Sequence, residues 1–235
     1  MRTKSKVRKK KAVQGELPYK SWGGPRRNSG PKRKAPRPLV RHRTRDPFPE
    51  RFPQHVTIRL VRGLPTLRRK AVYKALGRAL RLGGDRFGMR LIEYTVQRDH
   101  LHMIVEAADA PSLSRGMQGL TIRLAKALNR VWQRRGRVWG DRYHNRPLRT
   151  PREARNALAY VLHNCRRHGC NPRQNGIETP DIYTSAPWFP GWRFHLKALS
   201  LPFPRPTVDA RTWLLKTGWR RHGLIKAAEI PGPAP

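Results

Sequence analysis

The order of elements that the sequence predicts, β-α-β-β-α-β followed by one further helix, indicates an α+β protein with a ferredoxin-like, RRM-type core. Two observations support this fold class. Apolar residues switch between strand-like and helical spacing in this order between residues 54 and 170. In addition, only a short polar turn separates the second and third strands, which makes them an antiparallel hairpin. We therefore expect one sheet with helices on one face and the extra helix after the last strand.

The first half of this core contains a strand, a helix and the hairpin. Residues 55–61 predict the first strand. Pro65-Thr66 opens a helix whose apolar residues recur at helical spacing, and Gly83-Gly84 ends it. Residues 87–96 form the first strand of the hairpin, and the second strand begins at about His100.

The second half begins with a long helix. Ser112 or Ser114 can cap it, its apolar stripe extends over residues 113–131, and it should end near Gly136. Residues 137–148 then predict a further strand or hairpin.

The final helix has the clearest start signal in the chain. Thr150 is the expected N-cap, Pro151 occupies the first helical position, and Glu153 completes a capping box with Thr150. The helix should run to about His168 and stop at Gly169.

Basic segments flank the core. Residues 1–50 predict a disordered basic arm, residues 51–170 the folded domain, and residues 171–235 a Pro- and Trp-rich basic C-terminal extension packed on it. The chain carries 52 Lys and Arg against 14 Asp and Glu, a net charge of +38. Beyond the arm the counts are 35 and 11, so the folded part is itself cationic, with a net charge of +24. We expect a nucleic acid as partner, and a ribosomal or membrane-surface protein is the alternative.

The sequence predicts a cytoplasmic protein that does not associate with membranes. No apolar run is long enough to span a bilayer, and the basic N-terminus lacks the apolar segment of a secretory signal. The two cysteines, Cys165 and Cys170, fit a reducing compartment. Together with His163 and His168 they supply four zinc-type ligands. All four fall on one helix end, whereas zinc sites usually gather pairs from two elements, so zinc is not expected.

Two histidines on the third strand introduce the candidate chemistry. His100 and His102 flank one apolar residue, so their side chains project from the same face, about 7 Å apart along the strand. This separation suits two imidazoles that bind one metal ion. A His-x-His pair by itself is weak evidence and is more often two histidines on the more solvated face of a strand.

The final helix supplies the remaining groups of the site. Its polar face carries Tyr160, Asn164 and Arg167, and the first two are four residues apart and lie one above the other. Two histidines and the Asn164 carbonyl oxygen would provide three ligands of a mixed set that suits Mg²⁺ or Mn²⁺. A tyrosine hydroxyl becomes an effective nucleophile when such a cation polarises a phosphate and arginines neutralise the developing charge.

Other residues compete for these roles. Tyr143 and His144 are an alternative pair of nucleophile and base. We prefer the tyrosine on the final helix because an asparagine lies one turn beyond it. Glu93 could approach across the hairpin as a rival third ligand. Glu106 shares the face of the histidines but lies too far along the strand, and His55 should be structural or contact a phosphate.

In combination, these motifs resemble a known family. A His-Leu-His strand, a basic helix with Asn129, the Gly136 and Trp139 that follow it, and the Tyr160-x-x-x-Asn164 motif are similar to the single-tyrosine HUH transposases. Within them, the chain looks closest to the REP-associated tyrosine transposases of bacteria, which carry an IS200-like transposase domain. The resemblance covers roughly residues 54–170.

The resemblance implies roles for the candidate residues. His100 and His102 would be the HUH metal ligands, Tyr160 the nucleophile on a C-terminal catalytic helix, and Asn164 the third ligand. The chain departs from the family pattern in Gln97-Arg98-Asp99, where members often have Met-Pro-Asn, and at Cys165, where they tend to have proline. Neither change removes a catalytic group.

The sequence as a whole predicts a metal-dependent transposase that cleaves and rejoins single-stranded DNA through a 5′-phosphotyrosine, on hairpin-forming or REP-like DNA. The alternatives are a non-catalytic nucleic-acid-binding protein on the same fold and a rolling-circle-type nicking enzyme. The family implies either a monomer or a homodimer. The residues expected to bind the DNA backbone are Arg123, Lys126, Arg130, Arg134, Arg135 and Arg167.

Overall fold

The computed structural model describes residues 47–167, 169–170, 173–174, 177–193 and 203–232. The predicted basic arm, residues 1–50, lies outside these residues except for its last four. The strands of the main sheet are β1 (Gln54–Arg59), β2 (Asp85–Arg86), β3 (Met89–Val96), β4 (His100–Ala107) and β5 (His144–Pro147). The long helices are α1 (Lys70–Gly83), α2 (Ala110–Val131) and α3 (Pro151–Arg167). The C-terminal extension adds β6 (Arg173–Gln174), β7 (Ile177–Glu178), η1 (Ala186–Trp188), α4 (Trp213–Lys216) and η2 (Gly218–His222).

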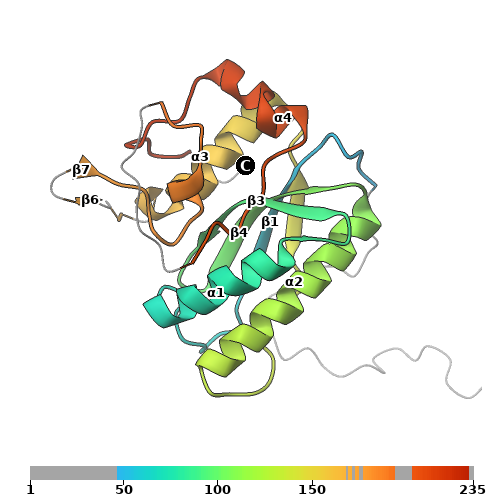
Figure 1. The fold of residues 1–235 in the computed structure, drawn as a ribbon, viewed down its shortest axis with the longest axis vertical. Coiled ribbons are helices and arrows are strands. Elements are labelled where there is room, and N and C mark those ends of the chain that lie inside the picture. Colours follow the sequence, from blue (N-terminus) through green and yellow to red (C-terminus); the bar gives the residue numbers. More distant parts are fainter. Residues whose placement is uncertain (1–46, 168, 171–172, 175–176, 194–202, 233–235) are drawn as a thin grey trace, which may run out of the picture. The chain divides into compact units, whose positions relative to one another are not determined.

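The strands β1 to β5 form one antiparallel sheet in the order β2-β3-β4-β1-β5 (Figure 1). β3 and β4 form the predicted hairpin, whereas β1 lies between β4 and β5. This pairing of β-α-β-β-α-β elements is that of a ferredoxin-like sheet, which confirms the predicted α+β fold class. The edge strand β2 was not expected. It pairs with β3 through a tight turn in which Phe87 (φ 58°) and Gly88 (φ 75°) both adopt positive φ.

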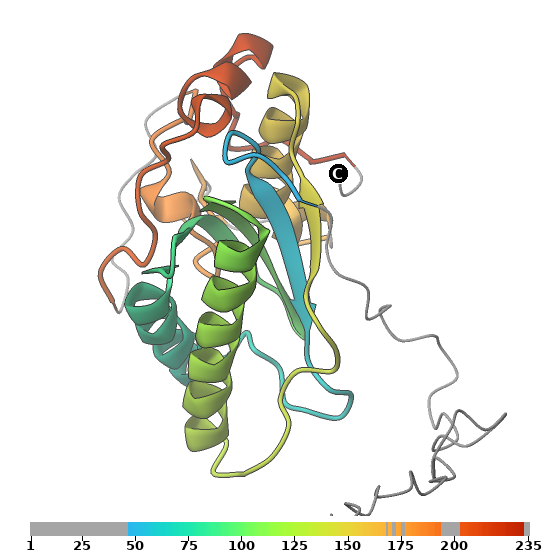
Figure 2. The ribbon, with the colours of Figure 1, turned by 90° about the vertical axis from the view of Figure 1, so that its right-hand side faces the viewer.

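Different helices cover the two faces of this sheet (Figure 2). Side chains alternate along β4, so Met103 and Val105 point to one face, and His102 and Ile104 point to the other. Met103 and Val105 belong to the core that α1 and α2 cover, whereas Ile104 belongs to the core beneath α3. The prediction of helices on one face therefore holds for α1 and α2, and the further helix α3 covers the opposite face.

The first helix begins later than the sequence predicts. It starts at Lys70 rather than at Pro65-Thr66. The Arg68 amide donates to the Thr66 hydroxyl, and the Leu67 amide donates to the carbonyl of Arg98. Because these peptide groups bond outside the helix, the segment before Lys70 forms a turn.

Helix α2 differs from its prediction at both ends. Asp109, not Ser112 or Ser114, is the N-cap, and its carboxylate accepts a hydrogen bond of 2.7 Å from the Ser112 amide. The helix ends at Val131 rather than near Gly136. The predicted apolar stripe is confirmed, because its leucines and methionine are buried against the sheet.

Helix α3 begins as predicted. The Glu153 amide donates to the Thr150 hydroxyl, and the Thr150 amide donates to the Glu153 carboxylate, which completes the capping box. The helix kinks at His163 (φ −113°, ψ 15°) and ends at Arg167, close to the predicted stop.

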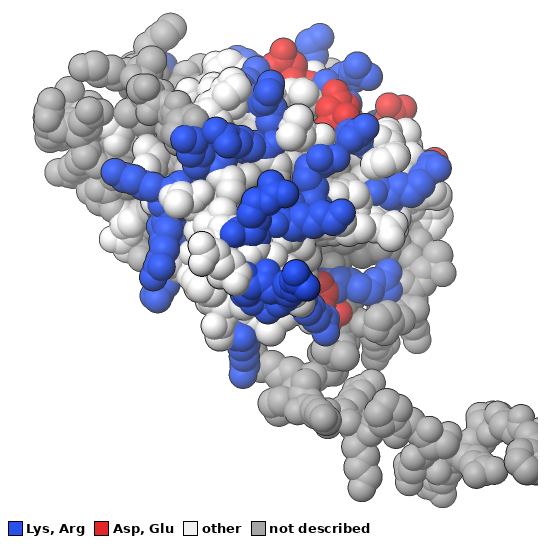
Figure 3. All heavy atoms as spheres, turned by 60° about the horizontal axis from the view of Figure 1, so that its bottom comes forward, with Lys and Arg blue, Asp and Glu red and all other residues white. Residues whose placement is uncertain are grey.

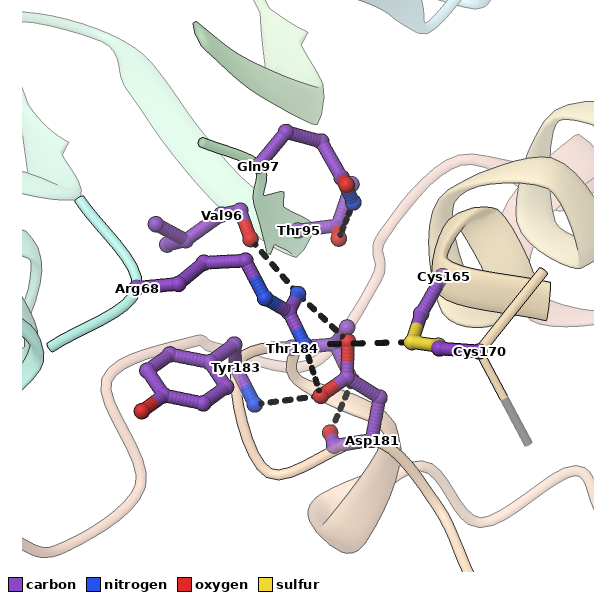
Figure 4. The surroundings of a disulfide bond; sticks show 9 residues. All are labelled: Arg68, Thr95, Val96, Gln97, Cys165, Cys170, Asp181, Tyr183 and Thr184. Atoms are coloured by element: carbon purple, nitrogen blue, oxygen red, sulfur yellow. Dashed lines mark hydrogen bonds and ion pairs between the residues drawn. A yellow bond between two sulfur atoms is a disulfide. The ribbon is translucent and has the colours of Figure 1, made fainter. Parts of the chain in front are cut away.

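Cys165 and Cys170 form a disulfide bond, which corrects the expectation of reduced thiols. The chain turns back at Gly169 (φ 79°), and the Cys170 amide donates to the Cys165 carbonyl, so their Cα atoms lie 5.4 Å apart. Figure 4 shows Arg68 beside this bond, where its guanidinium donates to the Cys165 sulfur and to both carboxylate oxygens of Asp181. These contacts tie the end of α3 to the segment before α1 and to the C-terminal extension.

The C-terminal extension is anchored to the sheet through Glu106 of β4. The Glu106 carboxylate accepts hydrogen bonds from the amides of Arg211 and Thr212 and pairs with Arg90. Beyond this anchor, Leu214 and Trp219 are buried in the core beneath α3. The C-terminal extension therefore packs beside α3. Within the described ranges, no helix is long and apolar enough to cross a membrane.

Candidate active site

Two histidines at the start of β4 face α3. The ring centroids of His100 and His102 lie 4.8 Å apart with their planes nearly perpendicular, at 88°. His102 is buried, whereas His100 is partly exposed. This close approach confirms that the two rings share one face of the strand.

Each histidine has a hydrogen-bond partner at Nδ1. His100 Nδ1 lies 2.6 Å from Asp99 Oδ1, and His102 Nδ1 lies 3.0 Å from the Thr57 hydroxyl oxygen. Partial burial alone would raise the pKa of Asp99, but the bond to His100 and the nearby Arg59 hold that pKa below its usual value. A carboxylate only accepts, so neutral His100 carries its proton on Nδ1 and its lone pair on Nε2. Such partners are typical of metal-binding histidines, which they orient.

Tyr160 reaches the histidines from α3. Its hydroxyl oxygen lies 3.4 Å from His102 Nε2, and the two rings meet edge to face, with centroids 5.0 Å apart and planes at 86°. The tyrosine is 6% exposed, and it comes from the same chain as the histidines. The structure thus brings together three of the four residues that the sequence assigned to catalysis and metal binding.

Asn164, the fourth residue, is fully buried one helical turn beyond Tyr160. Neither its Oδ1 nor its Nδ2 atom has a hydrogen-bond partner among the residues that the structure describes. Leaving a buried polar group without a partner costs about 1–3 kcal/mol, so packing alone does not explain an asparagine here. An amide oxygen that lacks a partner suits a hard divalent cation.

His55 of β1 completes an aromatic cluster around His102. Its ring stacks on that of His102, with centroids 5.2 Å apart and planes at 19°, and lies edge-on to Tyr160 at 5.8 Å. Burial, followed by the nearby His144 and Arg146, lowers the pKa of His55 to about 4, so its imidazole is neutral at pH 7. The sequence left two roles open for His55, and its burial favours a structural role over contact with a phosphate. Neither this stacking nor the Thr57 contact could be predicted, since both depend on the register of β1 with β4.

The competing residues lie elsewhere. Tyr143 belongs to the core beneath α1 and α2, on the opposite face of the sheet from His102. Glu93 pairs with Ile104 in the sheet, and no group of three or more His, Cys, Asp or Glu that could hold a metal occurs among the described residues. Glu106 is occupied with the C-terminal extension.

The predicted DNA-binding residues of α2 lie on the face opposite the histidines. A groove of about 720 Å³ separates α1 and α2, and a neighbouring pocket of about 580 Å³ lies at the C-terminal end of α2. Figure 3 shows this side of the molecule, with Lys and Arg spread over its surface and few acidic residues. The side chain of Arg167 lies outside the described residues. The cationic side chains of the groove and the pocket are Lys74, Arg78, Arg123, Lys126, Arg130, Arg134 and Arg135.

Comparison with known proteins shows what this part of the chain is similar to. Residues 55–164, which include both histidines, Tyr160 and Asn164, match the family model described as IS200-like transposase. This segment, somewhat under half of the chain, is therefore similar to the IS200-like transposases. The chain is also similar to the solved structure of a REP-associated tyrosine transposase bound to a REP hairpin, with 17% identity, a TM-score of 0.46, and coverage of 56% of this chain and 75% of that one. A comparison with curated protein sequences finds no match.

Proposed function

We propose that the chain is a metal-dependent transposase that cleaves and rejoins single-stranded DNA through a 5′-phosphotyrosine at Tyr160. The observation that carries this proposal is the distance of 3.4 Å between the Tyr160 hydroxyl and His102 Nε2. It supports the proposal because the proposed nucleophile and the proposed metal ligands lie together within one chain. Both a monomer and a homodimer are compatible with it.

The residues present fit a hard divalent cation, Mg²⁺ or Mn²⁺. His100 and His102 would bind it through Nε2, because Asp99 and Thr57 engage their Nδ1 atoms. Asn164 would supply its Oδ1 atom, which has no hydrogen-bond partner in the described part of the chain. When bound, the ion polarises the scissile phosphate and stabilises the charge that develops on its oxygens.

The chain's own residues then account for the reaction. The Tyr160 oxygen attacks the phosphorus and loses its proton to water. The bond from phosphorus to the 3′ oxygen breaks, and this oxygen takes a proton from water and leaves as a free 3′-hydroxyl. The new phosphotyrosine conserves the energy of the broken bond, so a 3′-hydroxyl can attack it and release Tyr160 without ATP. The edge-to-face contacts of Tyr160 with His102 and His55 fix its ring for this attack.

DNA can reach this site from the cationic face around one end of the sheet. Helix α2 runs back along β4, so its C-terminal end, with Arg130 and Arg134, lies at the end where β4 begins. The chain after α2 stays at this end, since the Gly140 amide donates to the carbonyl of Arg59, the register partner of His100. We propose that a DNA hairpin contacts α1 and α2 through its phosphates while its single-stranded flank passes to Tyr160.

Covalent capture of DNA tests the proposal. Wild-type protein, labelled hairpin DNA with single-stranded flanks and Mn²⁺ should give an adduct on a denaturing gel, and Tyr160→Phe should give none. Tyr143→Phe is the matched control and should keep the adduct. If the wild type binds several hairpins but yields neither adduct nor cleavage, the non-catalytic binding protein is the better description. An adduct with release of one strand and no rejoining would favour a nicking enzyme of the rolling-circle type.

A further inference from the structure

Helix α3 changes direction between the two functional residues that it carries. The kink lies at His163 (φ −113°, ψ 15°), so Tyr160 precedes it and Asn164 follows it. Sharp helix kinks usually arise at proline or glycine, or where another group interrupts the helix. Neither proline nor glycine occurs between Tyr160 and Arg167. The kink therefore coincides with tertiary contacts of His163 rather than with a helix-breaking residue.

The C-terminal extension holds the side chain of His163. This side chain is 4% exposed, and its Nε2 atom lies 2.9 Å from the carbonyl oxygen of Lys226. A carbonyl oxygen only accepts, so neutral His163 donates its Nε2 proton to Lys226. The Trp192 ring packs against the imidazole, with centroids 5.2 Å apart, and Trp192 pairs with Ile225 in an isolated β-bridge. Two segments of the extension thus enclose this side chain, and both lie outside the segment that matches the family model.

A second contact fixes the Lys226 carbonyl in place. The Glu229 amide donates to the same carbonyl over 3.1 Å, and the Glu229 carboxylate forms a bidentate ion pair with Arg155, two turns before His163 on α3. The two paired side chains are only 15% and 21% exposed. Partial burial alone would raise the pKa of Glu229, but Arg155 holds that pKa below its usual value. The turn of residues 226–229 is thereby attached to α3 at two points.

The kink determines the direction of Asn164. A regular α-helix has φ of about −63° and ψ of about −42°, so the backbone at His163 departs from these angles by about 50–60°. Because this departure lies directly before Asn164, it turns the Asn164 amide relative to Tyr160. The amide is fully buried and has no hydrogen-bond partner within the described ranges. Its direction therefore depends on the backbone and not on a partner of the side chain.

We infer that His163 is a positioning residue, whose hydrogen bond to the Lys226 carbonyl directs Asn164 Oδ1 at the metal site. Glu229 contributes by holding this carbonyl through its ion pair with Arg155. His163 does not itself bind the metal, because its Nε2 atom is engaged with Lys226. This role deepens the proposed function and rests on it, because it takes Asn164 as a metal ligand.

Metal binding by the full chain in the absence of DNA tests this role. His163→Leu should lower the Mn²⁺ affinity in isothermal titration calorimetry about tenfold, an effect typical of groups that orient metal ligands. His163→Gln places an amide nitrogen near the position of the imidazole Nε2 atom and can donate to the same carbonyl. It should therefore keep most of the wild-type affinity.

A double variant distinguishes positioning of Asn164 from a general loss of stability. Asn164→Leu removes the proposed ligand, so there is no longer an amide for His163 to direct. Adding His163→Leu to Asn164→Leu should therefore cause no further loss of Mn²⁺ affinity. A loss that acts through folding would instead add to that of Asn164→Leu.

Variants of the ion pair test the same contact from the C-terminal side and apply even if His163→Leu does not fold. Glu229→Gln should lower the Mn²⁺ affinity less than His163→Leu does, and it should cause no further loss in the Asn164→Leu background. Exchange of the two charges, Arg155→Glu with Glu229→Arg, should restore what either substitution loses alone. The matched control is Asp209→Asn, which also breaks an ion pair of the extension, but one whose acidic side chain is 85% exposed. It should bind Mn²⁺ like the wild type.

Three outcomes would overturn this role. The first is wild-type Mn²⁺ affinity in folded His163→Leu and in Glu229→Gln. The second is a loss from these substitutions that is equally large in the Asn164→Leu background. The third is wild-type affinity in Asn164→Leu itself, since Asn164 would then not be a ligand. Failure of the wild type to bind Mn²⁺ would instead overturn the proposed metal-dependent function.

Discussion

The two faces of the sheet differ in what they bury. Beneath α1 and α2 lie side chains such as Leu76, Leu101 and Leu124, which make up a continuous apolar core. Beneath α3 and beside it, the buried set also contains His55, Glu93, His102 and Asn164, each at most 6% exposed. The same β4 strand contributes to both faces, because alternate residues point in opposite directions.

This contrast shows how the molecule separates stability from chemistry. Apolar burial on the first face contributes to folding in proportion to the area removed from water. On the second face, Asn164, Glu93 and His55 each keep a buried polar atom without a hydrogen-bond partner among the described residues. Such atoms destabilise the fold unless a ligand satisfies them. We expect substitutions on the first face to lower stability, whereas those on the second face should change binding and, where they remove an unpartnered polar atom, raise stability.

The largest effect on folding is expected at Leu101, which is fully buried beneath α1 and α2. Leu101→Ala should lower the free energy of unfolding by about 2–5 kcal/mol because it leaves a cavity in the core. Urea denaturation measures this change, and calorimetry of the folded variant should give an unaltered Mn²⁺ affinity. Weakened metal binding in a variant of unchanged stability would show that the two faces are not separate.

The second face should make stability depend on pH through Glu93. Burial raises the pKa of its carboxyl group from an ordinary value of 4.5 to about 8, so between these values the folded state keeps a proton that the unfolded state releases. This group alone should therefore lower the free energy of unfolding by up to about 1.4 kcal/mol per pH unit as the pH rises through that window. Glu93→Gln does not titrate and should show a flatter profile in urea denaturation. Equal slopes for the two proteins would contradict the assignment.

Removal of a proposed ligand should affect metal binding more than folding. His102→Ala should lower the Mn²⁺ affinity at least about 100-fold, since even the partners of metal ligands contribute 10–100-fold. Isothermal titration calorimetry measures this affinity. His144 points to the same face from β5 but is exposed, so His144→Ala is the control and should bind Mn²⁺ like the wild type. Equal losses in both variants would argue against a site at His102.

The smallest effect, and one of opposite sign, is expected at Asn164. Asn164→Leu should raise the free energy of unfolding by about 1–3 kcal/mol, because it removes a buried amide that has no hydrogen-bond partner among the described residues. The same variant should bind Mn²⁺ more weakly, as calorimetry can show. A destabilised variant would mean that the amide takes part in packing contacts that the fold needs.

Local patterns predicted most of the fold. The His100–His102 alternation, the capping box of Thr150 and Glu153 and the apolar stripe of α2 depend on neighbours in sequence, and the structure contains each of them. The late start of α1 could not be predicted in this way. It depends on a bond from Leu67 to Arg98, which is distant in sequence.

The candidate site likewise combines features that the local sequence predicts with features that depend on residues distant in sequence. The spacing of Tyr160 and Asn164 predicted a shared helix, and the approach of Tyr160 to His102 followed from docking that helix on the sheet. The Thr57 contact and the His55 stacking arise from the register of the strands. The surroundings of Glu93 include residues of the C-terminal extension such as Arg205 and Lys216. None of these three features can be predicted from neighbouring residues in the sequence. The metal-binding and catalytic roles of these residues stay predictions.

The central claim is that the face beneath α3 carries the nucleophile. Protein trapped on DNA with Mn²⁺ can be digested with nuclease and trypsin, and the peptide that retains a nucleotide can be identified by tandem mass spectrometry. Cleavage after Arg155 and Arg166 isolates Tyr160, whereas cleavage after Arg142 and Arg149 isolates Tyr143, because trypsin does not cut between Arg146 and Pro147. We expect a phosphonucleotide on the peptide of Tyr160. A nucleotide on the peptide of Tyr143 would contradict it.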